Sequence, residues 1–118
     1  MAQKLDWIYF RKGCNTCKKA QAFLAGLGWE LGEHVIDATM ERIDGPSALV
    51  LAKKHQRLVS IKGKLVNDID LRKPVVSDDE ILHLIMGPTG NLRAPTFRHG
   101  KTLVVGYHEA AYKDVLEA

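Results

Sequence analysis

The sequence predicts an α/β domain in which a strand–helix–strand unit comes first and a strand–strand–helix unit comes last. Two observations carry this prediction. An apolar run at residues 5–10 gives way to a helical period after Cys14. Near the other end, residues 94–98 and 102–105 flank a turn and form a hairpin, and a helix follows to about Glu117. The segments between about residues 40 and 92 are therefore an insertion between the two halves.

The composition is that of an ordinary folded domain. Of the 118 residues, 46% are hydrophobic and 26% are charged, which suits a single domain over residues 1–118. No stretch approaches the roughly 18 consecutive apolar residues of a membrane span, and the N-terminus lacks a secretory pattern, so we expect a cytoplasmic protein without membrane contact. The net charge of +3 is low for a dedicated nucleic-acid binder, and we expect no direct nucleic-acid contact.

The first half begins with a buried strand at residues 5–10, which is short, apolar and bounded by the loop 11–13. A helix follows, because apolar residues recur on one face until two glycines end the pattern. The members of this face are Cys17, Ala20, Leu24 and Leu27. A second strand is expected at residues 33–37, where Val35 and Ile36 lie within a weak alternation.

The middle of the chain contains two predicted helices and one ambiguous segment. A helix is expected to begin at residues 44–46, where Pro46 lies near its first turn, and to continue over residues 47–56. Residues 77–80 form a capping box, in which serine is followed three residues later by glutamate, and begin a helix to about Met86. Residues 58–71 are either a small hairpin about Lys62-Gly63 or an irregular loop with a turn.

The two cysteines, Cys14 and Cys17, form one Cys-Asn-Thr-Cys unit between the first strand and the first helix. Cys17 falls on the apolar face and points toward the core. Cys14 lies one turn earlier, where unpaired backbone N–H groups and the positive end of the helix dipole favour a thiolate. Arg11 and Lys12 add positive charge beside it. The spacing predicts a redox pair in which Cys14 is the nucleophile and Cys17 is the resolving thiol.

Three other interpretations of the cysteine pair stay open. A zinc site would need two more ligands, and the five histidines show no paired spacing, so we expect no metal. A purely structural disulfide would close a very short loop and constrain the unfolded chain little. The third alternative is two inert, buried thiols.

The element order, the Cys-x-x-Cys unit and Pro95 before the third strand are similar to the thioredoxin fold, in which this proline is cis and faces the active-site cysteines. The chain further resembles the arsenate reductase and Spx-like family, whose members insert helices into a glutaredoxin-like fold. The resemblance is carried by the segments YFRKGCNTCKKAQAFLAGLG, NLRAP and KTLVVGYHEAAYKDVL. Some members of the most similar subgroup have selenocysteine at the position of Cys14, which is consistent with Cys14 as the attacking group.

The resemblance implies a thiol–disulfide oxidoreductase that has no bound cofactor and is reduced by an external thiol such as thioredoxin or glutathione. Its substrate would be a protein disulfide or a small oxyanion, and the expected substrate contacts are Lys12, Arg93 and Pro95. One alternative is an Spx-like, redox-switched regulator that binds the RNA polymerase α subunit. Another is an arsenate reductase, although such enzymes of this fold have an arginine directly before the proline, where this chain has Ala94.

Overall fold

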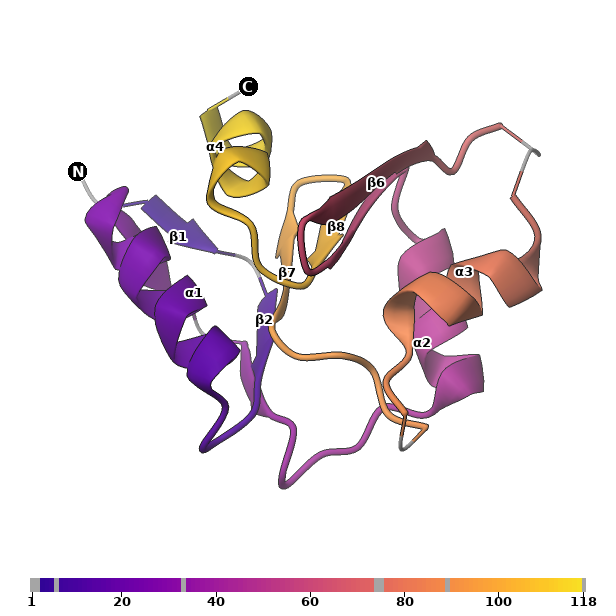
Figure 1. Ribbon diagram of the computed structural model, residues 1–118, viewed down its shortest axis with the longest axis horizontal. Helices are drawn as coiled ribbons and strands as arrows, with labels where there is room; N and C mark the ends of the chain where they lie inside the picture. Colours follow the sequence, from indigo (N-terminus) through magenta and orange to yellow (C-terminus); the bar gives the residue numbers. More distant parts are fainter. Residues whose placement is uncertain (1–2, 6, 33, 74–75, 89, 118) are drawn as a thin grey trace.

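The computed structural model describes residues 3–5, 7–32, 34–73, 76–88 and 90–117 (Figure 1). The elements in chain order are β1 (Gln3–Leu5), β2 (Trp7–Phe10), α1 (Asn15–Gly26), β3 (Trp29–Leu31), β4 (Val35–Asp37), α2 (Gly45–Lys53), β5 (Arg57–Lys62), β6 (Leu65–Asp70), α3 (Asp78–Ile85), β7 (Thr96–His99), β8 (Thr102–Val105) and α4 (Glu109–Glu117). The predicted α/β class is confirmed. None of the described helices is both long and apolar enough to cross a lipid bilayer.

The main sheet has the strand order β4-β2-β7-β8-β5-β6. Strand β2 pairs in parallel with β4 and antiparallel with β7, and β8 continues antiparallel to β7. These four strands come from the two predicted halves of the chain. The inserted hairpin of β5 and β6 extends the sheet at its far side, because β5 pairs in parallel with β8. The insertion therefore enlarges the sheet as well as adding helices.

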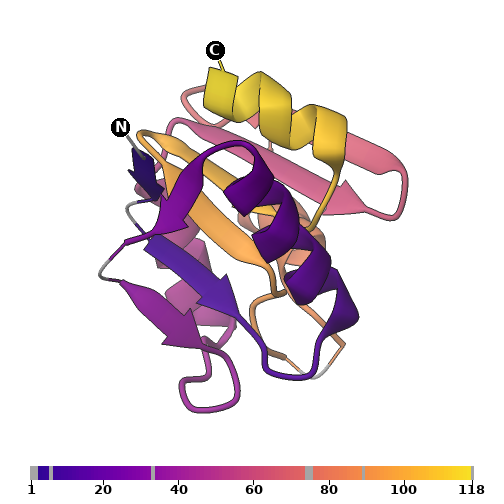
Figure 2. The same ribbon diagram turned by 90° about the vertical axis from the view of Figure 1, so that its left-hand side faces the viewer.

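Each face of the sheet is covered by two helices. Helices α1 and α4 lie together on one face, which Figure 2 shows toward the viewer, and α2 and α3 lie on the other. Side chains of β2 alternate between the two cores, as a pleated strand requires. Ile8 and Phe10 pack with α1 and α4, whereas Tyr9 packs with α2 and α3. Strand β2 is therefore buried on both faces, and the chain leaves it through the exposed loop 11–13 into α1.

Most predicted elements are present, and their ends follow from local capping. Helix α1 ends at Gly26, and Gly28 two residues later has a φ of +87°, which a glycine adopts without strain. The Asp44 side chain accepts a hydrogen bond from the backbone N–H of Ser47 at 2.9 Å and caps α2. Ser77 caps α3 in the same way through the N–H of Glu80 at 3.2 Å. The ambiguous segment is a hairpin, in which Lys62 pairs with Leu65.

The structure differs from the sequence-based expectation at the first strand. The expected single strand over residues 5–10 is two strands, β1 and β2, and Asp6 between them lies outside the described residues. β1 is not part of the main sheet and pairs in parallel with β3, a strand that the sequence pattern does not predict. A three-residue strand with no tight turn before its partner has no local signal, because its pairing is set by the return of the chain after α1.

Candidate dithiol site

Cys14 caps the N-terminus of α1. Its backbone is extended, with φ −86° and ψ 117°, and its sulfur accepts the backbone N–H of Cys17 at 3.2 Å. The carbonyl oxygen of Cys14 accepts the N–H of Lys18 at 3.1 Å, which closes the first helical turn. The first turn of α1 contains no acidic residue. The sulfur therefore lies where the unpaired N–H groups and the helix dipole favour negative charge.

Cys17 lies one turn further along α1 and is 2% exposed, whereas Cys14 is half-buried. Both are free thiols. Burial, together with the hydrogen bond to Cys14, raises the pKa of Cys17 to about 12. Cys17 consequently remains a protonated thiol at neutral pH, and Cys14 is the sulfur that a reagent from solvent can reach. This arrangement is the one that the sequence predicted for a nucleophile and the thiol behind it.

The raised pKa gives the first testable prediction. In a Cys14→Ser variant, Cys17 should react with iodoacetamide at pH 8 at least about 100-fold more slowly than a free thiol, because the thiolate fraction falls tenfold for each unit by which the pKa exceeds the pH. A thiol with a raised pKa is protonated below that value, so reactivity should appear only in strongly alkaline solution. The Cys17→Ser variant is the control, since its half-exposed Cys14 should react readily. Mass spectrometry measures the alkylation rates, and equal rates for the two variants would contradict the assignment.

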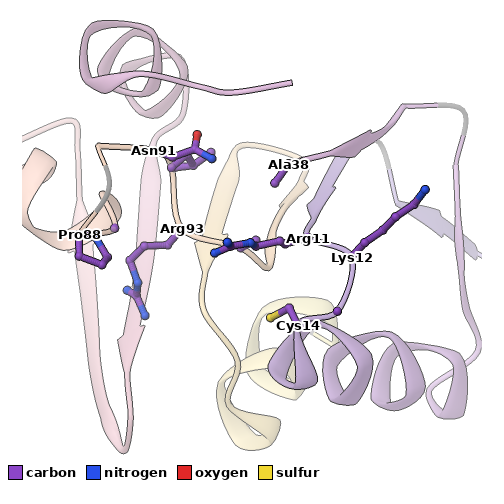
Figure 3. A pocket seen from close by; sticks show the side chains of 11 residues that line it. Arg11, Lys12, Cys14, Ala38, Pro88, Asn91 and Arg93 are labelled. Carbon is purple, nitrogen blue, oxygen red and sulfur yellow. The ribbon is translucent and has the colours of Figure 1, made fainter. Parts of the chain in front are cut away.

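A hollow of about 450 Å³ opens in front of Cys14 (Figure 3). It is lined by residues 11–14, Ala38, 87–88 and 91–94. The loop before α1 and the segment before β7, which are far apart in the sequence, therefore meet across the hollow. Among the described lining residues there are three cations and no carboxylate. The lining of the hollow is therefore electropositive, and Cys14 is part of it.

The structure places the two predicted cationic contacts in different settings. The Lys12 ammonium lies 3.6 Å from the Asp37 carboxylate, and Figure 3 shows the side chain extending away from the hollow. The Arg93 guanidinium donates hydrogen bonds to the carbonyl oxygens of Leu84 and Ile61, at 3.2 and 2.5 Å. Burial lowers the pKa of Arg93. Both residues line the hollow, but both side chains are engaged with the protein, and their roles as substrate contacts stay predictions.

The Ala94–Pro95 peptide bond is cis, as the resemblance to the thioredoxin fold implied. Pro95 itself is buried, and Ala94 rather than Pro95 lines the hollow. The carbonyl oxygen of Pro95 accepts the N–H of Gly106 at 2.8 Å, which fixes the segment against the end of β8. Pro95 does not line the hollow, and a substrate contact for it remains an expectation.

Two residues of the hollow were not among the predicted contacts. Arg11 extends across the hollow above the Cys14 sulfur in Figure 3. The sequence indicated only that Arg11 adds positive charge near Cys14. Asn91 accepts hydrogen bonds through Oδ1 from the Ile43 N–H at 2.7 Å and from the Tyr9 hydroxyl at 3.0 Å. Its partners are 48 and 82 residues away, so no local pattern could identify Asn91 as the residue that ties the segment before β7 to β2.

Comparison with known proteins places these features in a family. The model of the ArsC family matches residues 9–115, a span that includes both cysteines and the cis proline. The chain belongs to the ArsC family. Two curated relatives, both named global transcriptional regulator Spx, come from Streptococcus pyogenes serotypes M1 and M18. Each is 23% identical over 104 residues, which cover 86% of this chain and 78% of the relative.

A solved structure agrees with the fold of this ArsC-family chain. The YffB protein superimposes with a TM-score of 0.53 at 20% identity, covering 92% of this chain and 96% of that one. The expected thioredoxin-like fold with an insertion is thereby confirmed. At the level that these comparisons reach, the chain is an arsenate-reductase-like or Spx-like thiol protein. Within the described ranges, no three histidine, cysteine or acidic side chains gather closely enough to hold a metal ion.

Proposed function

We propose that this ArsC-family protein is a thiol–disulfide oxidoreductase that acts through Cys14 and Cys17. The Cys14 thiolate attacks one sulfur of a substrate disulfide, so that a bond to Cys14 forms, the substrate S–S bond breaks and one thiolate leaves. Cys17 then loses its proton to the departing group or to water, and its sulfur attacks Cys14. The second substrate thiolate leaves. Two electrons have passed to the substrate, and the protein holds a Cys14–Cys17 disulfide.

The observation that carries this proposal is the unequal placement of the two sulfurs. Cys14 is half-exposed at the helix N-terminus, and Cys17 is 2% exposed directly behind it with a raised pKa. A thiol that stays protonated does not compete with Cys14 for the substrate. It reacts only with the mixed disulfide that forms on Cys14, one helical turn away. The Cys14 sulfur lies close to Cys17, because it accepts a hydrogen bond from the Cys17 backbone N–H at 3.2 Å.

The cycle needs an external thiol reductant and no bound cofactor. A thioredoxin-type protein or glutathione would reopen the Cys14–Cys17 bond, and the oxidised substrate would be a protein disulfide or a small oxyanion. The test uses reduced protein mixed with an equimolar neutral disulfide, followed by peptide mapping. The expected product is an intramolecular Cys14–Cys17 bond that thioredoxin with its reductase and NADPH removes. Persistence of two free thiols, or a disulfide between two copies of the chain, would overturn the proposal.

A second candidate is a redox-switched regulator, which the likeness to the transcriptional regulator Spx favours. Such a protein would bind the RNA polymerase α subunit in one redox state and would not turn over disulfides. Pull-down with the purified α subunit, using reduced and oxidised protein, distinguishes the two. Arsenate reduction is the third candidate, and it has less support because the Arg93 guanidinium is held by two backbone carbonyls. Arsenate-dependent oxidation of NADPH in a coupled assay tests it.

A further inference from the structure

The cations that line the hollow differ in what holds them. Lys12 faces Asp37, and the Arg93 guanidinium is bonded to two carbonyl oxygens. The Arg11 side chain is exposed, and among the described residues it has no carboxylate or carbonyl partner. Because no carboxylate lines the hollow within the described part of the chain, the positive charge of Arg11 is not neutralised there. It is therefore the charge that remains available to a bound molecule.

Arg11 is also placed to act at the reacting sulfur. Its side chain extends over the hollow on the side to which the Cys14 sulfur points (Figure 3). It lines a second hollow of about 380 Å³, on the β4 side of α1, into which Cys17 opens. Burial has the largest effect on the pKa of Cys17 and raises it, and the charge of Arg11 has a smaller effect that lowers it. Arg11 and Lys12 line both hollows, and Asp37, which lies 3.6 Å from Lys12, lines the second one.

We infer that Arg11 determines substrate specificity by selecting oxidised substrates that have a carboxylate or another anionic group beside the attacked sulfur. The inference rests on the proposed disulfide exchange and leaves its bond changes as written above. The guanidinium offers a planar fork of N–H donors that matches a carboxylate in two parallel hydrogen bonds. The anion itself is not altered, and it orients the disulfide so that its sulfur faces Cys14.

The test compares three small disulfides of similar length and different charge. These are dithiodipropionate, hydroxyethyl disulfide and cystamine, which are anionic, neutral and cationic. Single-turnover rates of the pre-reduced protein give a ratio of anion to cation. In Arg11→Gln this ratio should fall about tenfold, since one partly screened charge near the substrate is lost. Arg11→Lys should keep most of it. The control Lys101→Gln changes the net charge equally at an exposed turn on the far end of β7 and β8, and it should leave the ratio unchanged.

A second measurement keeps the inference testable if disulfide exchange itself fails. In the Cys17→Ser background, the rate of alkylation by iodoacetate is divided by the rate with neutral iodoacetamide. Arg11→Gln should lower this quotient severalfold, and added salt should lower it in the protein that retains Arg11. An unchanged quotient and an unchanged disulfide ratio would overturn the role of Arg11. Loss of exchange with all three disulfides, with a quotient that still depends on Arg11, would instead overturn the proposed oxidoreductase while leaving anion selection in place.

Discussion

Disulfide reduction is expected to fall at least about 1,000-fold when Cys14 is replaced by serine, because a hydroxyl does not ionise near neutral pH and cannot replace the attacking thiolate. The fold should survive. The Cys14 side chain is half-buried and serine is a favourable helix N-cap, so the hydrogen bond from the Cys17 N–H has an acceptor in the variant. The measurement is the single-turnover rate with hydroxyethyl disulfide, together with a circular dichroism spectrum to verify folding.

The Cys17→Ser variant is the matched control for this prediction. It should retain the first step at nearly the original rate, because the attacked bond and the Cys14 thiolate are untouched. It should then stop as a mixed disulfide, since no second sulfur is available for closure. If Cys17→Ser lost the first step while Cys14→Ser kept it, the roles of nucleophile and resolving thiol would be reversed.

Replacing Gly106 by alanine is expected to lower the free energy of unfolding by about 3 kcal/mol or more, a large part of the stability of a small domain. Gly106 has a φ of +100°, and a Cβ at this position would lie 2.5 Å from the carbonyl oxygen of Ile61. The left-handed backbone costs about 1–2 kcal/mol for a residue with a Cβ. The overlap of the Cβ with the Ile61 backbone adds to this cost. Gly106 cannot easily move away, because its N–H donates a hydrogen bond to Pro95 and its carbonyl oxygen accepts one from the Tyr112 hydroxyl.

The control for this prediction is Gly100→Ala in the turn between β7 and β8. Gly100 also has a positive φ, of +59°, but a Cβ there meets nothing within 4 Å. Its cost should be only the backbone term of about 1–2 kcal/mol. Urea unfolding of both variants isolates the overlap at Gly106 as the difference between them. Equal destabilisation would mean that the chain relaxes around Ile61 and that Gly106 does not fix the segment next to the site.

The sequence predicts the dithiol because its signals are local. The change from strand to helical period and the position of Cys17 on the apolar face need only neighbouring residues. The same holds for the caps at Asp44 and Ser77, which accept hydrogen bonds from N–H groups three residues later. No local pattern establishes the cis bond before Pro95, and the expectation of this bond came from the resemblance to the thioredoxin fold.

The remainder of the site depends on contacts that are distant in the chain. Arg11 and Lys12 are adjacent cations, and only the fold shows that Lys12 lies beside Asp37 of β4. The role of Arg93 as a substrate contact stays a prediction, and the carbonyl oxygens that hold its guanidinium come from α3 and β5. These partners become neighbours only when the insertion packs on the sheet. Sequence periodicity describes single elements and contains no information on such pairings.

The most direct test of the dithiol mechanism is to identify which sulfur first bonds to the substrate. Reduced protein is mixed with one equivalent of dithiodipropionate, quenched with acid at successive times and analysed by peptide mapping. We expect an adduct on Cys14 at the earliest times, which disappears as the Cys14–Cys17 bond forms. An adduct that first appears on Cys17, or an adduct on Cys14 that never closes while Cys17 stays a free thiol, would contradict the mechanism.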